Sequence, residues 1–73
     1  MKVSEFRTAV DEEFGAVLGR VLVMDLVLDD VGGRTAAEAL EAGVPTVDVW
    51  RALCIANQVP AERWHGRGRP VRG

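Results

Sequence analysis

The sequence predicts an all-α protein, a small bundle of four helices followed by a short C-terminal turn, with a helix-turn-helix-like corner. Apolar residues recur at helical spacing, and glycine or proline closes the periodic segments. The chain has 73 residues, enough for one domain with a small core. We therefore expect a single helical domain over residues 1–64 and a disordered basic Gly/Arg tail over residues 65–73.

The first predicted helix begins after Ser4, a good N-cap residue. Phe6, Val10 and Phe14 follow at a spacing of four, and charged residues fill most of the positions on the other side. This pattern is typical of an amphipathic helix of about three turns. Gly15 marks the break before the next segment.

The second predicted helix covers residues 16–31 and is apolar on almost every side. Its only charged residues are Arg20, Asp25, Asp29 and Asp30. Its valines would also suit a strand, but the segment is longer than an ordinary strand. We also find no second strand-like segment for it to pair with. A helix that is apolar all round is either central in the core or covered by another chain, and both alternatives stay open here.

The third predicted helix begins at Thr35, because Thr35 and Glu38 have the spacing of a capping box. It ends before Gly43, which suits the left-handed backbone position that follows a helix.

The fourth predicted helix begins at Pro45 and ends before Pro60, where a short last turn leads to Trp64. Ile55 is an apolar residue on the side of this helix that is expected to be polar. The buried stripe is predicted to contain Val49, Trp50, Leu53, Cys54 and Ala56.

The third and fourth predicted helices have the order of a helix-turn-helix unit. Ala39, Gly43 and Val49 have the spacing of the small, turn and core residues in DNA-binding units of this kind. Such a unit needs Arg, Lys, Asn or Gln on its second helix to contact the bases. Arg51 is the only basic side chain in the opening turns of the fourth predicted helix. The pattern supports the geometry and argues against the DNA contacts, so we favour an ordinary helical corner.

The charges are divided unevenly along the chain. Residues 1–62 hold all 11 acidic side chains and five of the nine basic ones, which gives −6, whereas residues 63–73 carry +4. The acidic body should repel nucleic acid, and only the tail could attract it. The tail is similar in composition to Arg-Gly segments that bind RNA loosely, but its arginines are few, so we favour a solvated terminus.

Residues that could carry chemistry do not converge in the sequence. Cys54 is the only cysteine and His65 the only histidine, which excludes a disulfide within the chain and a Cys/His metal cluster. Cys54 lies on the apolar stripe and is expected to be a buried structural thiol. The adjacent acids Glu12 and Glu13 would point about 100° apart on a helix. We therefore expect no catalytic, cofactor-binding or metal-binding residues, and no enzyme.

Several short motifs are similar to those of a known family. The most specific combination is Gly32-Gly33-Arg34-Thr35 with the Val49-to-Cys54 segment, Val-Trp-Arg-Ala-Leu-Cys. On these motifs the chain resembles a family of short actinobacterial proteins of unknown function, numbered 3046, over about residues 1–63. Further matching motifs are Val3-Ser4-Glu5-Phe6, Asp11-Glu12-Glu13-Phe14-Gly15, Asp25-Leu26-Val27-Leu28, Ala42-Gly43-Val44 and Val59-Pro60.

The resemblance implies a small cytoplasmic helical protein without established ligand residues. Members are often encoded near a recombinase and its regulator, which implies a DNA-repair setting. Members also tend to carry polar residues around Val21 and Val23 and an acid at Ile55. This chain departs from the family there, and the departures put a monomeric state in doubt.

We expect a non-enzymatic protein-interaction module that binds an unidentified protein partner. The alternative is a helix-turn-helix-like nucleic-acid-binding protein that uses the Arg-rich tail. We expect no specific nucleic acid and no membrane partner, and a homodimer through the second helix if that helix is not central. A cytoplasmic location is expected because no leader or membrane-spanning segment is visible. The candidate partner-binding residues are Val23, Ile55, Trp64, Arg67 and Arg69.

Overall fold

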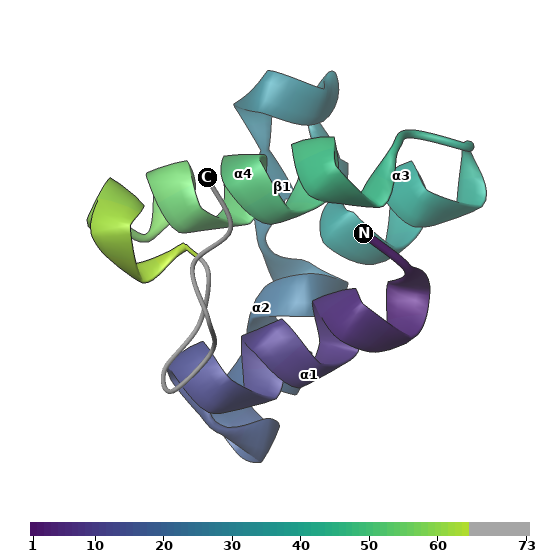
Figure 1. Ribbon diagram of the computed structural model, residues 1–73. Helices are drawn as coiled ribbons and strands as arrows, with labels where there is room; N and C mark the ends of the chain where they lie inside the picture. The colour runs from purple at the N-terminus through teal and green to yellow at the C-terminus, as the bar shows by residue number, and fades with distance from the viewer. Residues whose placement is uncertain (65–73) are drawn as a thin grey trace.

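The computed structural model describes residues 1–64, and the prediction of a mostly helical fold is confirmed for them (Figure 1). Two short 3-10 turns and a two-stranded antiparallel sheet accompany the helices. The elements are, in order, α1 (Val3–Phe14), α2 (Ala16–Asp25), β1 (Val27–Leu28), η1 (Asp29–Val31), β2 (Arg34–Thr35), α3 (Ala36–Glu41), α4 (Thr46–Ala56) and η2 (Ala61–Arg63).

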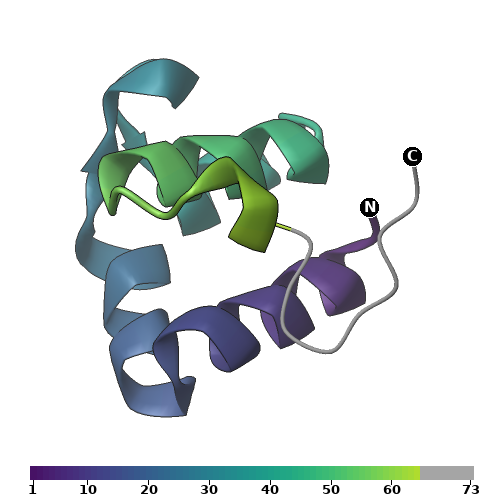
Figure 2. The same ribbon diagram turned by 60° about the vertical axis from the view of Figure 1, so that its left-hand side comes forward.

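The helices lie on two sides of a common core. Figure 2 shows α1 and α2 together on one side, α4 on the other, and the segment around β1 joining them along one edge. The largest fully buried side chains come from α1, β1 and α4: Phe6, Leu28, Val49, Leu53 and Cys54.

The prediction that Ser4 caps the first helix is wrong, because α1 begins earlier. Lys2 is the N-cap residue, and its backbone N–H donates to Glu5 Oε1 at 2.7 Å. Ser4 lies in the first turn, where its carbonyl accepts a hydrogen bond from the Thr8 hydroxyl. The carboxylate three residues into the helix therefore takes over the capping role.

The second helix is shorter than predicted, and the expectation that this region lacks a strand is wrong. α2 ends at Asp25, and Leu26 already has an extended backbone. Val27 then pairs with Thr35 and Leu28 with Arg34 in an antiparallel ladder. The reversal between the strands is closed by a hydrogen bond from the Gly33 N–H to the Leu28 carbonyl at 3.0 Å.

α2 lies at the surface, so the alternative of a central second helix is wrong. Gly15 joins α1 to α2 through a single residue with a φ of 85°, a conformation that glycine adopts without strain. Gly19 is the one buried residue of α2. A Cβ atom at Gly19 would lie 2.6 Å from Val10 Cγ1, so the missing side chain is what lets α2 approach α1.

The predicted capping box at the start of α3 is confirmed. The Thr35 hydroxyl accepts from the Glu38 N–H at 3.1 Å, and the Glu38 carboxylate accepts from the Thr35 N–H at 2.9 Å. The predicted left-handed position at Gly43 is also confirmed, with a φ of 89°. Val44 follows and donates its N–H back to the Ala39 carbonyl, which completes a Schellman motif.

α4 is the helix on which the core is built. It contacts α1, α3, β1 and η1. The Trp50 ring meets Phe6 and Phe14 of α1 edge-on, with centroids 6.3 Å and 6.4 Å apart. The predicted stripe is confirmed except at Ala56, which is exposed while Ala52 is buried.

Replacing Thr35 with alanine tests the cap. We expect Thr35→Ala to lower the free energy of unfolding by about 1 kcal/mol, because the Glu38 N–H loses its acceptor. Thr35→Ser keeps the hydroxyl and should stay close to wild type. Urea melts of the three proteins measure the difference, and equal midpoints for Thr35→Ala and Thr35→Ser would contradict the capping role.

Candidate protein-interaction surface

The most exposed apolar surface of any helix in residues 1–64 lies on α2. Val17 is 82% exposed, and Leu18, Val21 and Met24 are 47% to 57% exposed. Single exposed apolar residues are ordinary on a protein surface, but four on one three-turn helix are a contiguous patch. We call Val17, Leu18, Val21 and Met24 the α2 face.

The opposite side of α2 packs against the protein. Gly19 sits against Val10, and Leu22 and Val23 are half-buried against the core. Val23, which the sequence suggested as a partner-binding residue, is therefore mainly a packing residue. In the sequence, Gly19 is the residue that distinguishes the packed side of α2 from the exposed side, because a residue without a side chain marks where another helix comes closest.

An open groove borders the α2 face on the side of Arg20. It runs between α1, α2 and α3, with apolar residues such as Phe6, Val23 and Leu40 in its lining. Met24 belongs both to this groove and to the α2 face. The apolar surface therefore extends from the ridge of α2 into the groove beside it.

Ile55 is exposed as predicted, but it lies on a different part of the molecule. It belongs to α4, whereas Val23 packs inward from α2. Figure 2 shows these two helices on opposite sides of the core. The structure does not bring the two predicted partner-binding residues into one patch.

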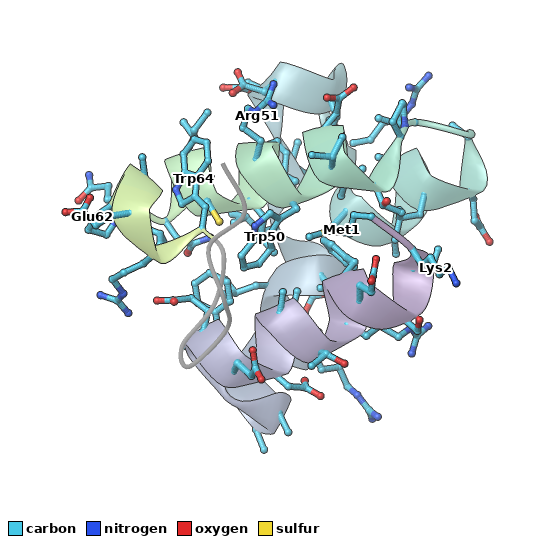
Figure 3. The ribbon with its side chains drawn as sticks, viewed as in Figure 1. Met1, Lys2, Trp50, Arg51, Glu62 and Trp64 are labelled. Atoms are coloured by element: carbon cyan, nitrogen blue, oxygen red, sulfur yellow. The ribbon has the colours of Figure 1, made fainter. Side chains whose placement is uncertain are left out.

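Trp64 folds back onto the domain. Its indole N–H donates to the Val59 carbonyl at 2.8 Å, and its own carbonyl accepts from Trp50 Nε1 at 2.6 Å (Figure 3). Beside it, Arg63 makes an ion pair with Glu13, whose side chain is only 3% exposed. These contacts make Trp64 part of the fold. The predicted partner-binding residues Arg67 and Arg69 lie outside the described residues.

The opening turns of α4 carry mixed charge. Arg51 lies 3.9 Å from Asp48 on the exposed side of the helix. The hollow next to them is lined by Asp30 and Arg34 as well. The basic residues Arg51 and Arg34 thus share this surface with acidic residues, which weakens its attraction for a phosphate backbone.

Cys54 is fully buried, as predicted. Burial raises the pKa of its thiol from 9.0 to about 12, and the nearby Glu13 carboxylate adds to the rise. A thiol in this state is protonated at neutral pH and is a poor nucleophile. Within residues 1–64, no cluster of His, Cys, Asp and Glu has the arrangement of a metal site, and no helix has the length and apolar character needed to cross a membrane.

The fold and the site define a small, mostly helical domain with one apolar helix face at its surface. Residues 1–62 match the family described as "Protein of unknown function (DUF3046)", and the chain belongs to that family. No curated protein matches the chain. No solved structure matches it either.

The raised pKa of Cys54 predicts a loss of stability at alkaline pH. The folded protein keeps the thiol proton up to about pH 12, while the unfolded chain releases it near 9.0. The contribution of this thiol to the free energy of unfolding is therefore complete below pH 9. It decreases as the pH rises, by about 1 kcal/mol at pH 10. Urea melts at pH 7 and pH 10 measure it. Cys54→Ala should lose less stability over this range than wild type, and an equal loss would contradict the assignment.

Proposed function

We propose that this protein is a small, non-enzymatic protein-interaction module whose contact surface is the α2 face. The observation that carries the proposal is the exposure of four large apolar side chains on one helix. Patches of this kind on small domains mark protein contacts. The family resemblance adds a cytoplasmic location and a DNA-repair setting to the proposal.

The arrangement around the α2 face also supports a protein partner. Arg20 and Asp25 border the apolar residues on α2, and Arg7, Asp11 and Glu38 line the adjoining groove. An apolar centre with charged residues of both signs at its rim is the usual composition of a protein interface. A surface that binds nucleic acid would instead carry an excess of basic side chains.

Capture of bound proteins from a native extract tests this proposal. Tagged wild-type protein should retain a set of proteins that Val21→Lys loses, because a charge at the centre of the α2 face must be desolvated on contact. Val47→Lys on α4 is the matched control, since Val47 is 43% exposed and Val21 47%. Equal capture by Val21→Lys and Val47→Lys would contradict the proposal.

The second candidate is a nucleic-acid-binding protein that uses α3, α4 and the Arg-rich tail. The +4 charge of residues 63–73 favours it, and the −6 charge of residues 1–62 opposes it. Duplex binding by wild type should therefore be weak and steeply salt-dependent, and it should vanish when residues 65–73 are removed. Fluorescence anisotropy with a labelled duplex measures this. Salt-resistant binding by the truncated protein would favour the second candidate over the first.

A further inference from the structure

The α2 face has the spacing of a helix-pairing seam. Val17, Val21 and Met24 are separated by four and three residues, which are the d, a and d positions of a heptad. All three are exposed, and Leu18 widens the seam on one side. Gly19 occupies the f position, opposite the seam, and this is the side that packs against α1. The seam therefore points directly away from the body of the protein.

Two opposite charges flank this seam. Arg20 occupies the g position on one edge and Asp25 the e position on the other. Both side chains are exposed, and neither forms an ion pair with another residue of the described part of the chain. They are five residues apart, which is the spacing of g-to-e′ ion pairs in parallel coiled coils.

We propose that the α2 faces of two copies of this chain pair in parallel about a two-fold axis. Arg20 of each copy then meets Asp25 of the second copy, so both charges gain a partner at once. An antiparallel pair would place Arg20 edges together and Asp25 edges together, with like charges opposed. The inference rests on the proposed function, because it names the partner that covers the α2 face.

The position of Asp25 adds a second electrostatic reason. Asp25 is the last residue of α2, and no basic residue lies in the last turn of that helix. An acid at a helix C-terminus is unfavourable because the carbonyl ends carry partial negative charge. The arriving Arg20 of the second copy supplies the positive charge that this helix end lacks.

The length of α2 sets the strength of the pair. Ten residues make a helix of about 15 Å, so two α2 faces bury less surface than a standard protein interface. We therefore expect a reversible dimer that dissociates in the micromolar range. Two-fold symmetry needs only one self-complementary surface, and the α2 face with its two charged edges provides one.

Charge exchange on purified protein tests the proposal. Arg20→Asp and Asp25→Arg each replace attraction by repulsion at both contacts, so each should weaken self-association at least about tenfold. The double variant Arg20→Asp/Asp25→Arg restores opposite charges and should return to wild-type affinity. An equimolar mixture of the two single variants should form a heterodimer more tightly than either variant pairs with itself. Sedimentation equilibrium at tens of micromolar measures all of these, against a monomer of 7.9 kDa.

Two outcomes would overturn the inference. One is a monomeric wild-type protein over the whole concentration range. The other is a dimer that the single charge changes leave unaltered, as an antiparallel pair or another surface would give. Circular dichroism of each variant confirms that the exposed substitutions leave the fold intact. A monomer whose capture of other proteins still depends on Val21 would overturn the self-pairing and retain the proposed function.

Discussion

Trp50 holds together segments that lie far apart in the sequence. Its ring is enclosed by Phe6 and Phe14 of α1, and its indole N–H binds the Trp64 carbonyl at the end of the described chain. A buried indole needs such a hydrogen bond, because its N–H would otherwise be desolvated without a partner. The arrangement satisfies that need with a backbone carbonyl and so fixes η2 against α4. Much of the core depends on this one side chain.

A core organised around α4 has a consequence for α2. The wide buried stripe of α4 is covered by α1, α3, β1 and η1, so the main apolar surfaces are already paired. α2 reaches this assembly mainly through α1 and α3, with Gly19 at the closest approach. Leu22 and Val23 also pack against the core, but the four residues of the α2 face have no surface left to cover within residues 1–64. The α2 face is thus a result of how the other elements pack.

Local signals in the sequence predicted both ends of α3, but not the start of α1 after Lys2 or the end of α2 at Asp25. The Thr35/Glu38 spacing and Gly43 identified α3 correctly, because capping acts within a few residues. The end of α2 was missed because Val27 and Leu28 pair with only two residues, and so short a ladder leaves no period to detect. The exposed face of α2 was suggested by excess apolar residues. Which side of α2 faces outward depends on the tertiary contact between Gly19 and Val10, and the sequence pattern alone does not give that contact.

Folding and association are coupled in a domain of this size. The core of a domain of about 70 residues rarely supplies more than roughly 3–5 kcal/mol, so any further apolar burial is a large fraction of the total stability. α2 contributes one buried residue, Gly19, and two half-buried ones, Leu22 and Val23, whereas its outward side chains add nothing to the stability of a single copy. Covering the α2 face removes that apolar surface from water, and binding to the folded state alone stabilises it by mass action. α2 has the fewest buried residues of the four α-helices, and for the same reason it is the helix that would gain most from a partner.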